Sequence, residues 1–432
     1  MKSLLFTCVG LNHETSPVEE RERLAFSPDE LPAALTRVSE KTHGAAILST
    51  CNRTEIYATV SEGEGASLID LLNEEKGASI DRSRFYVLHH EAAARHLFRV
   101  SAGIDSMILG ESQVLGQVRD AMSAATAAGT LNGVLSRAFH SAIAVGKRAR
   151  SETGIGRHAV SISSAAVALA RQHVGDLKDK TVLVISAGSA GKLAVRNLGE
   201  TGARILVANR TEERAVGLAE EIGPDAVGVA LSELSLALPR ADVVISGTGA
   251  GGFILGPAEI GPAAASRNGR GLLLIDVAVP RDVDPAVREI QGVSLFDIDD
   301  VEAVAEIGLS GRQAEVHGVE KIIEEEIAGF LGWWESLDVV PVITALRERA
   351  EEIRRRELER TIRRLPGIDE ETRERIEAMT AAIVKKMLDR PIARLKDGAD
   401  KGLYMEALQD LFDVHPSATH PHSVGRGPSP DA

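Results

Sequence analysis

The chain has 432 residues, of which 44% are hydrophobic and 26% charged, and its formal net charge is -14. This is the balance of a globular protein with material for several domains of roughly 100–200 residues, and the acidic charge argues against a generally basic nucleic-acid binder. Two cysteines are too few for a disulfide framework or a Cys-rich zinc centre, so we expect no metal site and a reducing cytoplasm.

Residues 1–160 mix short strand-like runs with helical stretches. The runs are Leu4–Val9, Ala45–Leu48 and Glu55–Val60, and the helical stretches are 91–102 and 113–128. Because they do not alternate regularly, we expect an α+β domain. The first run lacks a small-residue cleavage site, which favours a strand over a signal peptide. No apolar stretch approaches the roughly 18 residues that span a bilayer, so we expect no membrane association.

A Ser- and Ala-rich helix is predicted over about 160–172. The pattern of apolar residues changes at Lys178. The segments "KTVLVISAGSAG", "ARILVANRT", "ADVVISGTGA" and "GLLLIDVAVPRDVDP" are apolar runs separated by helical stretches. Continuous apolar strands that alternate with helices indicate a parallel sheet covered on both faces. Residues 161–300 are therefore predicted to form a doubly wound, Rossmann-like nucleotide-binding domain.

Residues 301–413 show long helical stretches, with Pro341 as an interruption or a helix start and a turn at 365–369. Ile343, Leu346, Ala350 and Ile353 form one apolar stripe on a charged helix. Because we expect this segment to have no core of its own that is large enough, a second copy of the chain is the expected partner. Residues 414–432 are rich in Pro, Ser, Gly and His and are predicted to be a disordered, solvated tail.

A nucleotide site is predicted where the strand Thr181–Ile185 is followed by Ser186-Ala187-Gly188-Ser189-Ala190-Gly191 and a helix. This is a dinucleotide fingerprint whose first glycine is replaced by serine, and a plain strand–turn–helix is the alternative. The second strand ends at Asn209-Arg210-Thr211. A guanidinium suits a 2′-phosphate better than a ribose hydroxyl, so NADPH is favoured over NADH. The alternative is that Arg210 is a solvated strand end.

Cys51 lies in "STCNRTEIY", between polar residues that a buried structural cysteine would not prefer. A thiolate can accept an acyl group as a thioester, whose carbonyl is more readily reduced by hydride than that of an ester. Cys51 is therefore a candidate nucleophile, with Arg53 expected to raise its thiolate fraction. The alternative is a cysteine placed by chance in a polar turn. Cys8 lies within an apolar run and is expected in the core.

His96 is the histidine with the richest polar context, since it precedes Ser106, Glu111, Gln113 and Gln117. It is the candidate for proton handling, although a lone histidine is more often a structural residue. His13 and the pair His89-His90 are weaker candidates.

At this point the sequence resembles a known family. "VGLNHETSPVEERERLAF", "STCNRTEIYA", "HLFRVSAGIDSMILGESQVLGQV", "GKRARSETGIGRHAVSISSAAVALA" and "LLLIDVAVPRDVDP" resemble, in order and spacing, the motifs of glutamyl-tRNA reductase. The resemblance continues through "RERAEEIRRRELERTIRRLPGID" and "DRPIARLK" to about residue 413.

The resemblance implies NADPH-dependent reduction of glutamyl-tRNA to glutamate-1-semialdehyde, the opening step of tetrapyrrole biosynthesis, through a thioester on Cys51. It implies a functional role for His96. It also implies a catalytic domain, a nucleotide domain and a helical dimerisation domain joined by a long spinal helix in a V-shaped homodimer, with room to hand the product to an aminomutase. The positions that match the family's substrate contacts are Thr50, Asn52, Arg53 (for the substrate carboxylate), Ser106, Glu111, Ser112, Gln113 and Gln117. Those that match its cofactor turn are Ser186–Gly191.

Two positions depart from the family's usual pattern. Family members usually carry Gly where this chain has Ser186, and often Ser where it has Gly247. Serine does not adopt strongly positive φ without cost, so we expect weaker NADPH binding or a displaced loop.

A tRNA substrate requires cationic side chains despite the acidic net charge. The helix 347–364 has eight arginines against five glutamates, and the stretch 146–158 is also basic. Both are candidate tRNA contacts, and a solvated face of ion pairs is the commoner explanation for each. Two other classes of function stay open: a shikimate-dehydrogenase-like oxidoreductase, which needs no nucleophilic cysteine, and a non-catalytic tRNA- or haem-binding regulator.

Overall fold

In the computed structural model, the described residues are 4–106, 109–111, 113–156, 162–186, 189–199, 201–306, 313–337, 339–365, 367–397 and 401–413. The chain divides into two compact units, residues 1–327 and 328–432. Each unit is described by itself below.

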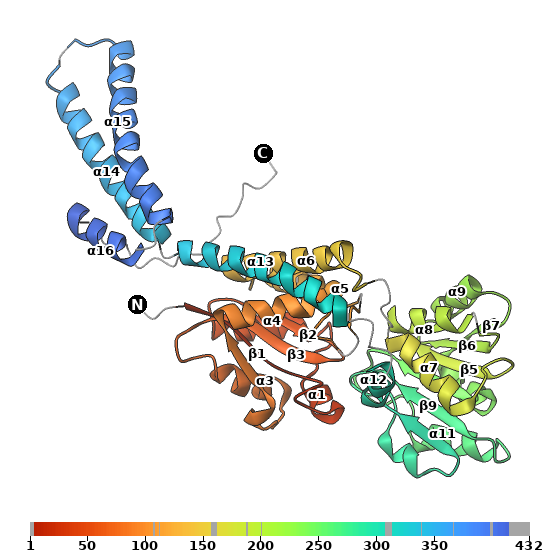
Figure 1. Ribbon diagram of the computed structural model, residues 1–432. Coiled ribbons are helices and arrows are strands. Elements are labelled where there is room, and N and C mark those ends of the chain that lie inside the picture. The colour runs from red at the N-terminus through yellow and green to blue at the C-terminus, as the bar shows by residue number, and fades with distance from the viewer. Residues whose placement is uncertain are drawn as a thin grey trace. The chain divides into compact units, whose positions relative to one another are not determined.

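The first unit begins with a four-stranded antiparallel sheet in the order β2-β3-β1-β4. Helices α4, α5 and α6 pack on one side of it and α1 and α3 lie on the other (Figure 1). The α+β prediction for this domain is therefore confirmed. The strands are β1 (Leu4–Asn12), β2 (Ala45–Ser49), β3 (Arg53–Ser61) and β4 (Tyr86–His89). The helices are α1 (Val18–Leu24), α2 (Leu31–Glu40), α3 (Ser67–Lys76), α4 (His90–Ala102), α5 (Gln113–Ala127) and α6 (Gly133–Glu152), with a 3-10 turn at Arg82–Arg84.

The same unit continues with a six-stranded parallel sheet in the order β10-β9-β8-β5-β6-β7. Its strands are β5 (Thr181–Ser186), β6 (Arg204–Asn209), β7 (Ala226–Ala230), β8 (Val243–Gly247), β9 (Leu272–Asp276) and β10 (Val293–Phe296). Its helices are α7 (Ile162–Val174), α8 (Ser189–Gly199), α9 (Glu212–Ile222), α10 (Leu234–Ala237), α11 (Pro257–Ala265) and α12 (Ile298–Glu306), with 3-10 turns at Leu231–Glu233, Leu238–Arg240 and Pro285–Glu289.

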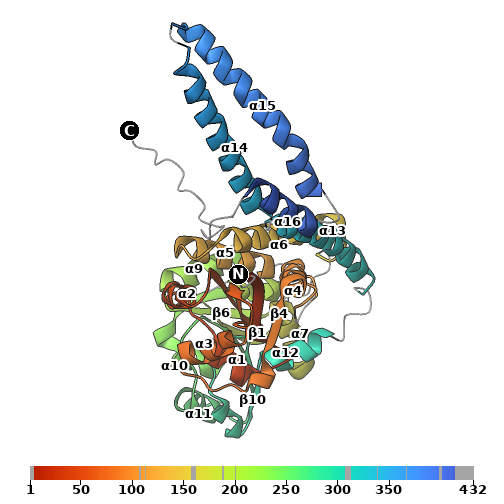
Figure 2. The ribbon, with the colours of Figure 1, turned by 90° about the vertical axis from the view of Figure 1, so that its left-hand side faces the viewer.

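Both faces of this parallel sheet are buried, which explains why its strands are continuously apolar. Along β5, Val182 and Val184 face the core shared with α7, α8 and α12. Leu183 and Ile185 face the opposite core, shared with α10 and α11. Figure 2 shows the domain from a second side. The predicted doubly wound, Rossmann-like domain is confirmed.

Helix α13 (Gln313–Leu337) begins in the first unit and is held there by acidic side chains. Glu320 pairs with Arg99, Glu324 with Arg95, and Glu325 accepts from Arg148 at 2.8 Å. Val319 and Ile323 are buried on the same helix. The predicted spinal helix is thus attached to α4 and α6 by ion pairs and by apolar packing.

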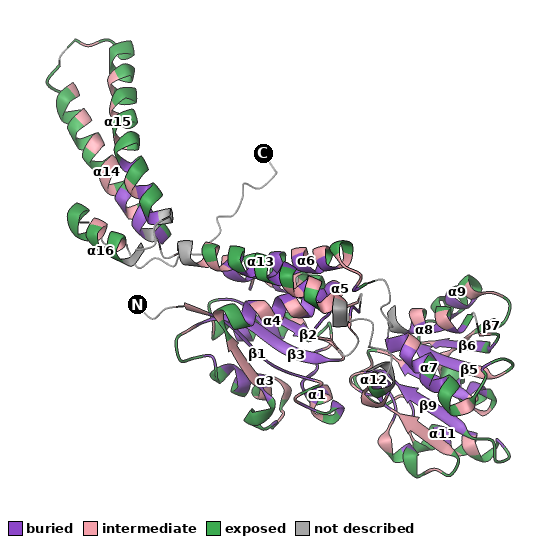
Figure 3. Ribbon diagram, viewed as in Figure 1, coloured by how far each residue is buried: buried purple, intermediate pink, exposed green. Residues whose placement is uncertain are grey.

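The second unit contains α14 (Val339–Ile362), α15 (Glu370–Asp397) and α16 (Lys401–Phe412). Pro341 lies in the first turn of α14, where proline is tolerated. Ile343 and Leu346 are buried in a small core with Leu388 and Leu395 of α15. Half of the apolar stripe is therefore covered within this unit, contrary to our expectation, while Ile353 keeps 48% of its surface exposed. Figure 3 shows burial in α14 and α15 confined mainly to one end.

None of the helices in the described part of the chain is long and apolar enough to cross a bilayer. The predicted tail, 414–432, lies outside the described residues.

Candidate active site

Cys51 lies at the tip of the hairpin between β2 and β3, and its polar neighbours build that turn. The Thr50 N–H donates to the Arg53 carbonyl at 2.9 Å. The Thr50 hydroxyl accepts from the backbone N–H groups of Asn52 at 3.1 Å and Arg53 at 3.3 Å. The Cys51 carbonyl accepts from Arg21 Nη1 at 2.7 Å. The turn therefore holds a half-buried thiol in a fixed backbone conformation.

Buried polar atoms without partners gather around this turn. Asn52 Oδ1, His13 Nδ1 and Arg21 Nε are buried and find no hydrogen-bond partner within the described residues. The His13 N–H donates to the Asn52 carbonyl at 3.0 Å, which places the two residues side by side. Each unsatisfied buried group costs about 1–3 kcal/mol. Such a cluster is typical of a site that water or a polar ligand completes.

Helix α12 of the nucleotide domain contacts the same region. Asp299 pairs with Arg21 and accepts from the Val18 N–H at 3.1 Å, so it caps α1. Glu302 lies 3.3 Å from His13 Nε2. Burial and the cations Arg53 and Arg21 lower the pKa of His13 to about 4. His13, a weaker candidate in the sequence, is thus a neutral side chain beside the Cys51 turn.

Arg53 is fully buried in an ion-pair network at the start of β3. Its guanidinium donates to Glu55 at 2.9 Å and to the Asp105 carboxylate at 3.0 Å. Glu55 also accepts from the hydroxyls of Tyr57 and Tyr86, each at 2.6 Å. Although burial opposes ionisation of Glu55, the nearby His96 and Arg53 lower its pKa to about 2.

His96, on α4, lies in this network. Its Nε2 donates to Glu55 at 2.8 Å and its Nδ1 lies 3.4 Å from Asp105. Burial favours the neutral imidazole, but the two carboxylates prevail and raise the pKa of His96 to about 9. The ring is therefore doubly protonated at neutral pH. The hydrogen bonds and ion pairs of His96 within the described residues go to Glu55 and Asp105, and its catalytic role beside Cys51 stays a prediction.

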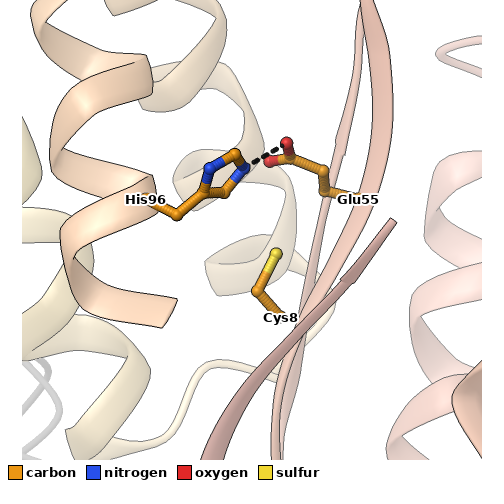
Figure 4. A group of neighbouring side chains, drawn as sticks. All are labelled: Cys8, Glu55 and His96. Atoms are coloured by element: carbon orange, nitrogen blue, oxygen red, sulfur yellow. Dashed lines mark hydrogen bonds and ion pairs between the residues drawn. The ribbon is translucent and has the colours of Figure 1, made fainter. Parts of the chain in front are cut away.

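The cysteine that lies near His96 is Cys8, which is buried in β1 as predicted. Cys8, Glu55 and His96 each offer one ligand atom, and these atoms lie within 4.8 Å of one another (Figure 4). The Glu55 carboxylate, however, already receives four hydrogen bonds, and the Arg53 cation lies against it. Because a metal cation would have to displace these donors, we interpret the cluster as a hydrogen-bond network.

The electrostatic surroundings of Cys51 differ from our expectation. Burial and the Glu111 carboxylate raise the pKa of the Cys51 thiol to about 12, and Arg53 offsets only part of this. Arg53 lowers the pKa of Cys51 as expected, but burial outweighs this effect, so the net shift in this conformation is upward. Burial also raises the pKa of Glu111 to about 7. A carboxylate with that pKa near a protonated thiol is a candidate general base.

The other predicted substrate contacts lie in the segment after α4. Ser106 is half-buried there, and Gln113 and Gln117 are half-buried in the first turns of α5. Ser112 lies outside the described residues. Sequence reasoning missed Arg21, Glu55 and Asp105. Glu55 carried a signal, because a carboxylate inside an apolar strand must find buried partners.

The predicted nucleotide turn lies between a strand and a helix, as expected. Strand β5 ends at Ser186, α8 begins at Ser189, and Ala190 and Gly191 lie in its first turn. Ala187 and Gly188 lie outside the described residues. At the end of β6 the Thr211 N–H donates to Asn209 Oδ1 at 2.9 Å, and Arg210 is exposed with no recorded ion pair within the described residues. An unpaired guanidinium at this edge fits a 2′-phosphate.

The fold and the site define a class: an oxidoreductase whose Rossmann-like domain adjoins a domain that presents a thiol. Known proteins agree with this description. The model of the glutamyl-tRNA reductase N-terminal domain matches residues 9–153, that of shikimate / quinate 5-dehydrogenase residues 168–304, and that of the glutamyl-tRNA reductase dimerisation domain residues 318–414.

Whole-length relatives identify the family. Glutamyl-tRNA reductase from Pelotomaculum thermopropionicum is 45% identical, over 95% of this chain and 94% of that protein. The protein of the same name from Geobacter sulfurreducens is 42% identical, over 96% and 97%. The solved structure of glutamyl-tRNA reductase from Methanopyrus kandleri is 37% identical, with a TM-score of 0.51, and covers 96% of this chain and 99% of that one. The chain belongs to the glutamyl-tRNA reductase family, which confirms the resemblance seen in the sequence.

Proposed function

We propose that the protein reduces the glutamyl ester of glutamyl-tRNA to glutamate-1-semialdehyde with NADPH, through a thioester on Cys51. The observation that carries this proposal is the Cys51 turn: a half-buried thiol beside the Glu111 carboxylate and the unsatisfied buried atoms of Asn52, His13 and Arg21. Membership of the family supplies the substrate.

The first step is acyl transfer. Glu111 accepts the thiol proton, the sulfur attacks the ester carbonyl, and the C–O bond to the terminal ribose breaks as a C–S bond forms. The tRNA leaves with a protonated hydroxyl. A base is required because a thiol with a pKa of about 12 is almost fully protonated at neutral pH.

The second step is reduction of the thioester. When bound, NADPH supplies the hydride, and the protein holds it through the turn Ser186–Gly191 and through Asn209, Arg210 and Thr211. The acyl carbon gains hydride, the C–S bond breaks, and the sulfur recovers a proton as the aldehyde leaves. Arg210 supports NADPH over NADH because its exposed guanidinium suits a 2′-phosphate.

For Arg53 to bind the substrate carboxylate, one of its two ion-pair partners, Glu55 or Asp105, must be displaced. Glu55 is fully buried, whereas the Asp105 side chain keeps 19% of its surface exposed. A substrate carboxylate would thus replace Asp105 on the guanidinium, which would also remove one of the two acids that flank His96. His96 is then free to pass a proton.

The active form is proposed to be a cytoplasmic homodimer, since tRNA is cytoplasmic and the region 318–414 matches the family's dimerisation domain. A groove of about 380 Å³ lies between α14 and α15, with Leu358, Met379 and Ile383 in its lining. Met379 and Ile383 are 56% and 50% exposed. A second copy would cover these apolar side chains. Transfer of the reactive aldehyde directly to an aminomutase is part of the proposal.

The test is Cys51→Ser. It should abolish aldehyde formation while tRNA binding persists, and mass spectrometry of the wild type mixed with glutamyl-tRNA without NADPH should find glutamate on the peptide that contains Cys51. Cys8→Ser serves as the matched control, because that sulfur is predicted to carry no acyl group. Full activity of Cys51→Ser, or an adduct on Cys8, would refute the thioester route.

A further inference from the structure

A basic cavity lies between α5 and α6 and includes part of the basic stretch 146–158 that the sequence offers as a candidate tRNA contact. Its volume is about 450 Å³, and its lining residues are Leu115, Gly116, Arg119, Lys147, Arg150 and Ser151. Three of the six lining residues are cationic, and none of those described is acidic. On the α5 side the cavity is lined by the uncharged residues Leu115 and Gly116.

Two of the three cations of this cavity differ from the neighbouring Arg148, which acidic side chains neutralise. Arg148, on the neighbouring position of α6, pairs with both Glu152 and Glu325. Arg119 and Lys147 have no recorded ion pair within the described residues. The pKa of Arg150 is lowered by burial and by the nearby positive charge of Arg119. Arg119 and Lys147, held close together without an acidic partner among the described residues, would be stabilised by an anion.

The cavity is connected to the candidate active site through Glu111. Arg150 Nη2 donates to the Glu111 backbone carbonyl at 3.1 Å. The carboxylate of the same residue is the one that raises the pKa of Cys51. Glu111 therefore contacts a cation of the cavity through its backbone carbonyl and acts on the thiol through its carboxylate.

The other basic candidate, helix α14, has a different character. Arg354 and Arg355 pair with Glu351, Arg356 with Glu352, and Arg349 with Glu352. These are surface pairs along one helix, typical of a solvated face. Binding phosphate there would require the arginines to give up their carboxylates, whereas the cavity offers Arg119 and Lys147 directly.

We propose that this cavity binds the phosphodiester that precedes the terminal nucleoside of the aminoacylated tRNA. The inference rests on the proposed function. The acyl group to be transferred is attached to the terminal ribose, so the phosphate nearest to it is one nucleoside away from the reacting carbonyl. Arginine and lysine donors match phosphate oxygens, and each such contact also releases counterions from the RNA. The phosphate groups of NADPH share this chemistry and are the other source that the test must separate.

The test is the double variant Arg119→Ala/Lys147→Ala in the full-length protein. Both side chains are exposed, so the fold should persist. We expect the KM for glutamyl-tRNA to rise about tenfold or more, and the salt dependence of tRNA affinity to weaken by about one unit of log–log slope. The KM for NADPH and the release of nitrophenol from the 1-(p-nitrophenyl) ester of glutamate should not change, since neither needs the cavity.

Two charge-matched variants serve as controls. Lys41→Ala/Arg82→Ala removes two exposed charges from the same domain, and Arg355→Ala/Arg356→Ala removes two from α14; both should behave as the wild type does. The inference is overturned if the cavity variant matches these controls, if it raises the KM for NADPH instead, or if it slows the small ester equally. If wild-type protein makes no aldehyde from glutamyl-tRNA, the proposed function fails first, and the two failures are thereby distinguished.

Discussion

Ser186 and Gly247 are paired neighbours on the parallel strands β5 and β8. These are the two positions at which we expect, from the resemblance in the sequence, a departure from the family's usual glycine at the first and frequent serine at the second. A Cβ atom added at Gly247 would lie 3.0 Å from Val277 Cγ2, so this position has little spare room. The two positions are therefore adjacent in the sheet, and we predict that substitutions at them compensate each other.

This adjacency predicts coupled effects of substitution. Gly247→Ser alone should destabilise the domain by about 1 kcal/mol or more, because the added atoms crowd Val277. Ser186→Gly alone should strengthen NADPH binding a few-fold by freeing the cofactor turn. The double variant should lose less stability than the sum of the single changes, since neighbouring sites couple by about 0.5–3 kcal/mol. NADPH titration and thermal unfolding measure both effects, and strictly additive changes would contradict the compensation.

The pKa of Glu111 predicts the pH dependence of acyl transfer. Since this pKa is raised by burial to about 7, the fraction of ionised Glu111 increases as pH rises through 7. The rate of tRNA release without NADPH should rise with it and level off above about 8. Glu111→Gln should lower the rate by about 10²- to 10⁴-fold and remove the inflection.

Glu111→Asp is the matched control, because it keeps a carboxylate and should keep an inflection. Single-turnover measurements with labelled tRNA between pH 5.5 and 9 would follow both variants. An unchanged profile in Glu111→Gln would assign the base to another group.

The sequence was sufficient to predict the two sheet-containing domains, because the apolar residues of their strands follow simple patterns. Strands β5, β8 and β9 are continuously apolar and are covered on both faces. Strand β7 was not predicted, since "AVGVA" is short and only partly buried at the edge of its sheet. The sequence also indicated that Cys51 lies in a polar turn, because its neighbours are turn-forming residues.

The electrostatics of the site could not be predicted in the same way. Arg53 lies two residues after Cys51 in the chain, yet its guanidinium is paired with Glu55 and with Asp105, which is 52 residues away in sequence. Only the tertiary fold brings α4 and the loop after it against β3. Arg53 lowers the pKa of Cys51, as its place in the sequence suggests, but burial in the folded protein reverses the net shift.

The His96 network predicts how stability depends on pH. The pKa of His96 is about 9 in the folded protein against 6.5 for an ordinary histidine. This raised pKa contributes stability that is complete below pH 6.5 and is lost as pH rises through 9, on the order of 3 kcal/mol. His96→Gln should therefore lower the unfolding midpoint at pH 6 and flatten its decline between pH 7 and 9.5. His140→Gln, exposed on α6, should keep the wild-type decline.

Rate measurements distinguish a proton-handling role of His96 from a purely structural one. If the ring handles a proton, His96→Asn should slow aldehyde formation at pH 7 more than it weakens tRNA binding. A variant that is merely less stable, with an unchanged rate per folded molecule, would make His96 a structural residue.

Gly10 is predicted to be essential for burying Glu55. The two residues face each other across β1 and β3, and a Cβ atom at Gly10 would lie 2.7 Å from Glu55 Cγ and 2.6 Å from the Thr54 carbonyl. Gly10→Ala must therefore push Glu55 away from Arg53 and His96, at a cost of about 1–3 kcal/mol. The pH-dependent decline ascribed to His96 should shrink as well. Gly217→Ala in α9, where nothing lies within 4 Å, should instead be neutral or stabilising by about 1 kcal/mol. Thermal unfolding of both variants at pH 6 and 9.5 tests this, and a tolerated Gly10→Ala with the wild-type decline would show that Glu55 does not depend on the space that Gly10 leaves.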